Sequence, residues 1–316
     1  MAAAAEVRPF IQYLEILPPD FMAATVVTQD HSVVTGGKHP PRRIGWLLLS
    51  PMLAWLTVFV VAPAAILFVY SFCQRDELGL IVYDFTWTNY TRIVDPIYFK
   101  IFAWSLWYAG LTTAICLLIG YPVAYYIARA PVGRRSTYLL LLMIPFWISF
   151  LLRTYAWISL LKADGLVNAT LQSMRLISVP LDVLYTPVAV LIGLVYTYLP
   201  FMILPIYTSA EKLDGSLIEA SMNLGAGPWR TLAHVVIPLT KPGIFAGILL
   251  VFVPSIGMFA VNDLMGGGRV DMIGNVIQNQ FGQARDWPFG AALGMTFLAL
   301  FVVSFWFLHG RGEVRR

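Results

Sequence analysis

The stretch Glu219–Leu239, which reads EASMNLGAGPWRTLAHVVIPL, interrupts a chain that is otherwise rich in apolar residues. Ser216 and Glu219 form an S-x-x-E pattern, which is typical of the first turn of a helix. Gly225 is expected to end this helix in a bend with positive φ, and Pro228 favours the start of a new helix. The stretch therefore predicts two short helices that meet at a bend.

One face of the first predicted helix consists mostly of small residues. The residues at positions i, i+3, i+4 and i+7 of this face are Leu217, Ala220, Ser221 and Leu224. Such a narrow face is suited to docking into a groove of another protein. The second helix is expected to end at Pro238 and Pro242, before the next apolar segment begins.

The composition of the whole chain is that of a membrane protein. Of its 316 residues 59% are hydrophobic and only 12% are charged, with a mean hydropathy of +0.73. Such a chain cannot cover itself with polar surface, so a polytopic membrane protein is expected. The basic residues are scattered, which excludes nucleic acid as a partner. Cys73 and Cys116 form no metal-binding or disulfide pattern.

Six segments are apolar over about 20 residues or more, the length that crosses a hydrocarbon core of about 30 Å. Prolines within these segments, such as Pro145 and Pro200, are tolerated in membrane helices because neighbouring groups satisfy the freed backbone groups. The expected fold is thus an all-α polytopic membrane protein with six transmembrane helices. The segments are roughly 45–70, 101–127, 137–161, 187–210, 242–264 and 287–308.

The distribution of Lys and Arg predicts the orientation of these spans. With the N-terminus in the cytoplasm, 13 of the 21 Lys and Arg residues lie in cytoplasmic segments and seven lie in outer loops. The short loop Ala128–Ser136 contains three arginines and no acid. We therefore expect both termini in the cytoplasm, with an N-terminal tail at 1–44, the six-helix domain at 45–308 and a C-terminal tail at 309–316.

The opening stretch resembles the EAA loop of ABC-importer permeases. The resemblance implies a methionine-importer-like permease core, in which residues 214–241 form a coupling loop between spans four and five that contacts a cytoplasmic ATPase. ATP and Mg²⁺ would bind that separate ATPase, since this chain has no P-loop motif and is expected to bind no cofactor itself. Ser221 stands where the motif has its second alanine. The residues compared with the motif are Glu219, Ala220, Ser221, Gly225 and Pro238.

Further stretches are similar to the spermidine/putrescine permeases, and in particular to the first of their two paired membrane subunits. This resemblance implies a bacterial inner-membrane protein that forms half of a polyamine pathway. It implies a second permease subunit, two copies of an ABC ATPase and a periplasmic or extracellular substrate-binding protein as partners, in addition to the lipid bilayer. The stretches are Phe146–Trp157, Tyr196–Tyr207, Pro238–Ile244 and Met272–Leu293.

One departure from the polyamine permeases concerns the cargo. Met258 stands where those proteins tend to carry a glutamate, and Asn262 stands where they usually have proline. Met258 is expected about 24 Å into the fifth span, at 1.5 Å per residue. Asp263 is close in sequence and is a candidate to replace the missing carboxylate.

Several other residues are candidates for the substrate path. Aromatic faces attract ammonium groups, although such rings also serve in packing or in the interfacial belt. Arg153 is the one charge well inside an apolar span, and it is a candidate for gating or for docking of the binding protein, with simple snorkelling to the interface as the alternative. Asp286 is either a solvated loop charge or an attractor of cations. The aromatic candidates are Trp147, Tyr155, Tyr196 and Tyr198.

Alternative functions differ in how much of the sequence they explain. The nearest alternative keeps the importer architecture and changes the cargo to thiamine, another cation, an anion or a metal, and Met258 favours it. A stand-alone secondary transporter requires ionisable relays within the spans and leaves the EAA loop unexplained. An enzyme is least favoured, because no catalytic residues, paired carboxylates or metal-ligand cluster are evident.

Overall fold

The computed structural model describes residues 42–310 of the chain and the side chains of residues 49–303. The chain divides into two compact units, Met1–Ala62 and Pro63–Arg316. Most of the tails expected at 1–44 and 309–316 lies outside the described residues. The boundaries of the tails and of the six-helix domain therefore stay predictions.

The described part of the first unit is helical. α3 (Arg42–Leu56) continues into a π-helical turn at Thr57–Val61. The described side chains of this unit are exposed, as expected for a helix that contacts lipid. Together with α4 (Ala62–Tyr70), the stretch Leu49–Tyr70 is long and apolar enough to cross a membrane, in agreement with the first predicted span.

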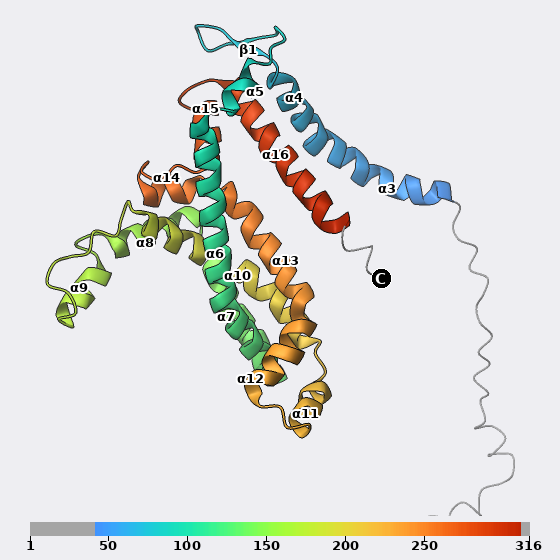
Figure 1. The fold of residues 1–316 in the computed structure, drawn as a ribbon, viewed down its shortest axis with the longest axis vertical. Helices are drawn as coiled ribbons and strands as arrows, with labels where there is room; N and C mark the ends of the chain where they lie inside the picture. Colours follow the sequence, from blue (N-terminus) through green and yellow to red (C-terminus); the bar gives the residue numbers. More distant parts are fainter. Residues whose placement is uncertain (1–41, 311–316) are drawn as a thin grey trace, which may run out of the picture. The chain divides into compact units, whose positions relative to one another are not determined.

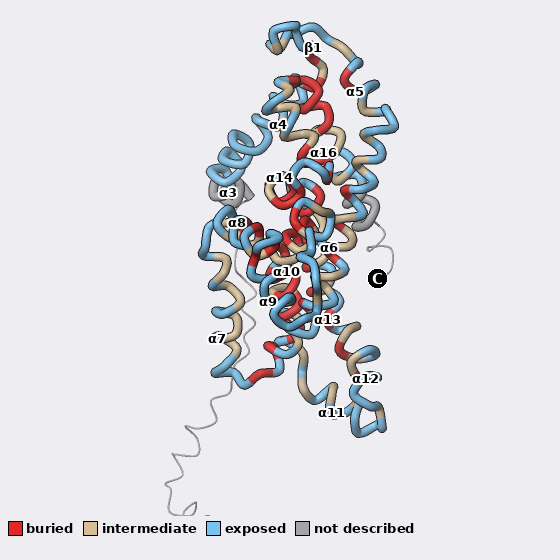
Figure 2. Tube along the Cα trace, turned by 90° about the vertical axis from the view of Figure 1, so that its left-hand side faces the viewer, coloured by how far each residue is buried: buried red, intermediate tan, exposed pale blue. Residues whose placement is uncertain are grey.

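Three long helices form the core of the second unit (Figure 1). They are α6 (Pro96–Arg129), α10 (Pro187–Glu211) and α13 (Ile237–Ile256), which pack against one another. Figure 2 shows the buried residues gathered where these helices meet, whereas α7 and the α11–α12 end are mostly exposed or half-buried. Small residues allow the close approach of the backbones: a Cβ atom at Gly243 would collide with the carbonyl oxygen of Pro205 and the side chain of Ser209.

The third predicted span, at 137–161, is wrong as a single straight helix. α7 (Val132–Met143) leads into a 3₁₀ turn at Ile144–Trp147, and the chain restarts as α8 (Phe150–Leu161) and α9 (Leu166–Ser173), with an 88° bend at the break. Pro145 lies in the 3₁₀ turn. Because proline has no N–H and crowds the preceding turn, it favours the end of a helix here instead of being absorbed within one.

The fifth predicted span, at 242–264, has the wrong boundaries at both ends. The helix begins at Pro228 and runs without interruption to Ile256, so Pro238 and Pro242 do not end it. A π-helical turn at Leu232–Val236 explains the continuation through Pro238, because its wider hydrogen bonding accommodates the proline ring.

The fifth helix ends at a tight backbone contact. Gly257 follows Ile256, and a Cβ atom at Gly274 in α15 (Ile273–Phe281) would collide with the Gly257 carbonyl group. After this break the chain resumes as α14 (Ala260–Gly266). Met258 therefore lies in the break between two helices and not inside the span where it was expected.

The total number of spans stays a prediction. Four helices within the described residues are long and apolar enough to cross a membrane, or five if the bent pair at 132–173 counts as one span. The sixth expected segment, at 287–308, corresponds to α16 (Trp287–Gly310). Its part over Trp287–Val303 is an apolar helix that is shorter than the four spans.

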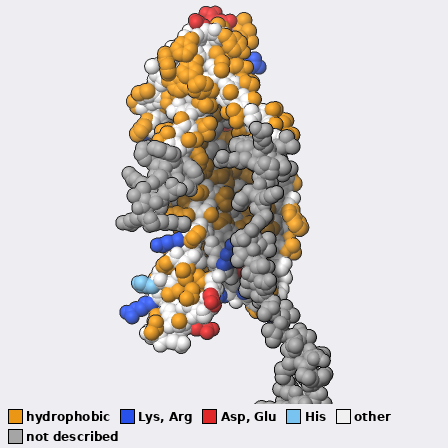
Figure 3. Space-filling view, turned by 90° about the vertical axis from the view of Figure 1, so that its right-hand side faces the viewer, with side chains coloured by type: hydrophobic (Ala, Val, Ile, Leu, Met, Phe, Trp, Pro, Cys, Tyr) orange, Lys and Arg blue, Asp and Glu red, His pale blue; other side chains and the backbone are white. Residues whose placement is uncertain are grey.

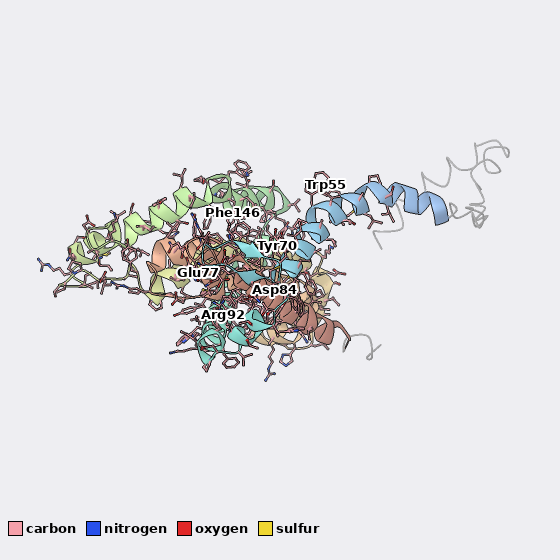
Figure 4. All side chains as sticks on the ribbon, turned by 90° about the horizontal axis from the view of Figure 1, so that it is seen from above. Trp55, Tyr70, Glu77, Asp84, Arg92 and Phe146 are labelled. Carbon is pink, nitrogen blue, oxygen red and sulfur yellow. The ribbon has the colours of Figure 1, made fainter. Side chains whose placement is uncertain are left out.

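An ion pair joins α5 to the start of α16 at the end of the second unit that is opposite α11 and α12. We call this contact the clamp. A hairpin of β1 (Gln74–Arg75) and β2 (Ile81–Val82) precedes α5 (Thr88–Ile93). Arg92 of α5 donates to Asp286 at 2.9 Å, and its guanidinium lies 3.8 Å from the centroid of the Phe289 ring. In Figure 4, which views this end from above, Arg92 lies over the helices of the unit. Asp286 is thus buried and paired, which corrects the expectation of a solvated or cation-attracting carboxylate.

We predict that Gly243→Ala destabilises the second unit by about 1–3 kcal/mol, because the new methyl group overpacks the contact between α10 and α13. The thermal unfolding midpoint of the detergent-purified transporter complex measures the effect. Gly110→Ala in α6 is the matched control, since nothing lies within 4 Å of its Cβ position. Equal midpoints for the two variants would contradict the packing argument.

Candidate functional site

The first candidate region is the coupling loop, residues 214–241. Its first helix, α11, spans Gly215–Asn223, and its cap is Asp214, whose carboxylate accepts a hydrogen bond from the backbone N–H of Ser216 at 3.0 Å. This corrects the expected start at Ser216. The same hydrogen bond lowers the pKa of the Asp214 carboxyl below its ordinary value, because it favours the ionised form. Glu219 is exposed on this helix and is not part of the cap.

The turn after α11 has the geometry that the sequence predicted. Gly225 has a φ of +84°, in the left-handed region. The backbone N–H of Gly225 donates to the carbonyl of Met222 at 2.9 Å, and that of Ala226 donates to the carbonyl of Ser221 at 3.1 Å. This pair of bonds is the Schellman motif, which satisfies the last carbonyl groups of the helix.

A side-chain hydrogen bond then fixes the angle between the two helices of the loop. α12 (Pro228–Thr231) begins at its proline, as predicted. The hydroxyl groups of Ser221 and Thr231 lie 3.1 Å apart, and Thr231 is buried. Ser221, the departure from the EAA pattern, therefore contacts α12 where an alanine would leave Thr231 unpaired. Sequence reasoning did not single out Thr231, which is marked only by its position in the second predicted helix.

The loop leaves an apolar surface exposed. Leu217 is 47% exposed, Leu224 is 89% exposed and Trp229 is 82% exposed. In Figure 3 charged side chains of both signs surround this end of the second unit. Pro238 lies apart from the other motif residues, half-buried in the first turn of α13.

The second candidate region is the break between α13 and α14. The side-chain amide of Asn275, in α15, donates to the carboxylate of Asp263 and to the carbonyl of Phe259 at 3.1 Å. The amide of Asn262 donates to the Asn275 side-chain oxygen at 2.9 Å. Asp263 itself is exposed, so this network orients a carboxylate at the surface of the second unit. Sequence reasoning missed Asn275, which has no local pattern to mark it.

Met258 contributes packing to this region. Its side chain is half-buried and lies against the main hydrophobic core. The side-chain oxygen of the buried Asn262 has no hydrogen-bond partner among the described residues. Within the same part of the chain, no group of three or more His, Cys, Asp or Glu residues is placed to hold a metal ion.

Arg153 is enclosed by aromatic rings. Its guanidinium carbon lies 4.6 Å from the centroid of Phe146 and 5.9 Å from that of Tyr196. The atoms Nε and Nη1 are buried and have no hydrogen-bond partner in the described part of the chain. Two of the three guanidinium nitrogens are therefore shielded by the second unit itself. A role in gating or docking stays a prediction.

The aromatic path candidates are not brought together by the fold. Tyr198 is buried in the core, whereas Tyr196 is half-buried and packs against Trp157 at 5.4 Å between ring centroids. Trp147 and Tyr155 are exposed, at 75% and 54%. Tyr196 also lies beside another candidate, Arg153, whose guanidinium carbon is 5.9 Å from the ring centroid.

Comparison with known protein families gives a match over the larger part of the chain. The family model described as "Binding-protein-dependent transport system inner membrane component" matches residues 118–309. The match includes the coupling loop, the break between α13 and α14, and most of α16.

Known relatives match over a larger share of the chain. The spermidine/putrescine transport system permease protein PotB of Escherichia coli (strain K12) is 43% identical over 262 residues, which is 82% of this chain and 95% of that protein. The protein of the same name from Haemophilus influenzae is 42% identical over 259 residues, 81% of this chain and 91% of the relative.

A solved structure shares the fold. The crystal structure of a bacterial ABC transporter involved in the import of the acidic polysaccharide alginate contains a chain that matches with a TM-score of 0.66 and 16% identity, covering 87% of this chain and 98% of that chain. At this identity the match establishes the fold alone.

Proposed function

The chain belongs to the family of binding-protein-dependent transport system inner membrane components and is a permease subunit of an ABC importer, and we propose that its cargo is a polyamine such as spermidine or putrescine. The observation that supports this cargo is the 43% identity to the E. coli spermidine/putrescine permease, which extends over 95% of that protein. The chain is a transporter subunit and not an enzyme.

We propose that the subunit works in an assembly with three kinds of protein. A second permease subunit would complete the pathway, two copies of an ATPase would bind ATP and Mg²⁺, and a binding protein would deliver the cargo. The family description, which names dependence on a binding protein, supports the last of these. We place the assembly in the bacterial inner membrane, with both termini of this chain in the cytoplasm.

The coupling loop is the proposed contact with the ATPase. Its exposed apolar side chains, Leu217 and Leu224, would be covered in such a contact. The Schellman turn and the hydrogen bond from Ser221 to Thr231 would let the loop move as one body. A movement of the ATPase would then displace the whole loop without changing its shape.

The long helix that begins within the loop, at Pro228, offers a route for that movement. Residues 228–256 form one continuous helix, about 43 Å long at 1.5 Å per residue. Its far end adjoins the break that holds Met258 and leads to Asp263. We propose that displacement of the loop moves this break and so changes access to the pathway, which would give alternating access.

Asp263 is the proposed cation contact in the pathway. Its carboxylate is exposed and oriented by Asn275, and Phe259, one helical turn earlier, is 43% exposed. A carboxylate beside an aromatic face is suited to an ammonium group. Sparse contacts of this kind also let a flexible polycation leave. A different small solute remains the second candidate cargo, because Met258 places an apolar side chain where a carboxylate was expected.

We predict that Gly225→Val uncouples transport from ATP hydrolysis. Valine at a φ of +84° is strained by about 1–2 kcal/mol, so the turn changes shape while the membrane helices remain intact. Ligand-stimulated ATP hydrolysis by the complete complex in vesicles measures the coupling, and we expect it to be lost with normal membrane insertion.

Gly227→Val is the matched control for this substitution. Gly227 lies two residues further on, with φ −69° and ψ 165°, an extended conformation that valine adopts readily, and its Cβ position is in open space. Full coupling in the Gly225 variant would count against the proposed role of the turn.

We predict that Asp263→Asn lowers uptake of labelled spermidine and putrescine by the complete complex. Asparagine keeps an oxygen that accepts from Asn275 and removes only the negative charge, so a structural role alone predicts unchanged uptake. Met258→Glu should raise polyamine uptake or leave it unchanged, whereas for an anionic cargo it should block uptake. If the unmutated complex imports no polyamine, the cargo is another solute and the permease assignment stands.

We predict that a reporter fused after Gly133 is exposed to the cytoplasm and that one fused after Gly165 is exposed outside. The three arginines between Ala128 and Ser136 favour retention of this loop in the cytoplasm. Accessibility of each fusion to a membrane-impermeant reagent measures the topology. The reverse result at both sites would overturn the proposed orientation.

A further inference from the structure

A groove runs between the end of α6 and the coupling loop. It is a cavity of about 480 Å³, and its wall on α6 extends from Tyr121 to Arg129. Its opposite wall comes from α11, α12 and the π-helical turn at Leu232–Val236. The lining side chains are mostly aromatic and aliphatic, so the groove offers an apolar surface to whatever occupies it.

The groove has a closed end and an open end. Tyr121 and Arg129 are eight residues apart on one helix, which corresponds to about 12 Å along its axis. Near Tyr121 the phenol oxygen lies 3.2 Å from the hydroxyl of Thr240, and this contact joins α6 to α13. Arg129 is the last residue of α6 and lies at the open end. The groove therefore extends from the helix ends toward the apolar middle of the unit.

The open end carries a positive charge without an acidic partner. The Arg129 guanidinium lies 5.6 Å from the centroid of the Tyr125 ring, and it forms no ion pair with any described residue. The neighbouring Arg135 is already engaged, since it donates to Glu211 at 3.3 Å and to the carbonyl of Ala130 at 2.8 Å. Arg129 is thus the arginine of this loop that lines the groove and is available for an anion.

Amphipathic aromatic side chains surround the same opening. Tyr126 is 65% exposed and Trp229 is 82% exposed, and both line the groove. Exposed tyrosine and tryptophan at the ends of membrane helices are typical of the level of lipid headgroups. A basic pocket between membrane helices on the cytoplasmic side is also a recognised site for anionic headgroups.

We propose that this groove binds an anionic phospholipid of the cytoplasmic leaflet, with an acyl chain between α6 and the coupling loop and the phosphate on Arg129. The site rests on the proposed orientation, which places the coupling loop in the cytoplasm. A soluble ATPase fits this groove less well, because the groove extends about 12 Å along α6 from the helix end and is lined mostly by apolar side chains. The lipid would bridge α6 and the coupling loop.

Native mass spectrometry of the complete transporter tests the site. The complex is reconstituted in nanodiscs of phosphatidylethanolamine with or without phosphatidylglycerol, and the phospholipids that it retains are counted. We expect preferential retention of phosphatidylglycerol, about fivefold weaker in Arg129→Gln and restored in Arg129→Lys. Arg134→Gln is the matched control, because Arg134 is exposed in the same loop and does not line the groove.

Three results would overturn the proposal. Retention of phosphatidylglycerol that is equal in the unmutated and Arg129→Gln complexes excludes the site. So does equal retention of the two phospholipids by the unmutated complex. Unchanged lipid retention combined with weaker ATPase binding in Arg129→Gln would assign the groove to the ATPase. Polyamine uptake is measured separately, so a failure of the cargo proposal leaves the lipid measurement unaffected.

Discussion

Hydrocarbon offers no hydrogen-bond partners, so each backbone N–H and C=O group in the membrane must be bonded by the protein itself. The irregular parts of this fold occur where that condition is met. At the break after α13, the side chain of Asn275 bonds the carbonyl of Phe259. The first N–H of α15, that of Ile273, donates to the hydroxyl of Ser105 in α6 at 2.8 Å. One carbonyl of the break is thus bonded by α15, and the start of α15 beside it is bonded in turn by α6.

One continuous helix connects the coupling loop to the break. The helix from Pro228 to Ile256 continues through Pro238, Pro242 and Pro254 without a break. Glycines then bring this helix close to its neighbours, as at Gly247, where a Cβ atom would lie 2.8 Å from the sulfur of Met202. A helix that is continuous and closely packed transmits displacement, whereas a flexible joint at Pro238 would absorb it.

The sequence predicted the local features of the fold better than the contacts between distant elements. The positive φ of Gly225 and the helix start at Pro228 depend on a few neighbouring residues, and both are confirmed. Pro145 and Pro238 show the limit of local reasoning. Pro145 lies inside a predicted span and Pro238 lies just before one. The chain breaks at the first and continues as a helix through the second, because the outcome depends on the turn around each proline and on the helices packed against it.

The candidate site shows the same limit. The coupling loop is a contiguous motif and was found from the sequence, apart from its cap, where Asp214 takes the place expected for Ser216. Asn275 and Asp263 are twelve residues apart and meet only because α14 and α15 fold together. Asp286 is bonded to Arg92, 194 residues away, so its burial had no local signal.

These differences in sequence separation imply an order of folding during synthesis. The bonds that shape the coupling loop join residues no more than ten positions apart, so the loop can form as soon as Thr231 has left the ribosome. The clamp between α5 and α16 must wait until nearly the whole chain has been made. We therefore expect the loop at residues 214–241 to be complete early, and the clamp at the opposite end of the second unit to be assembled last.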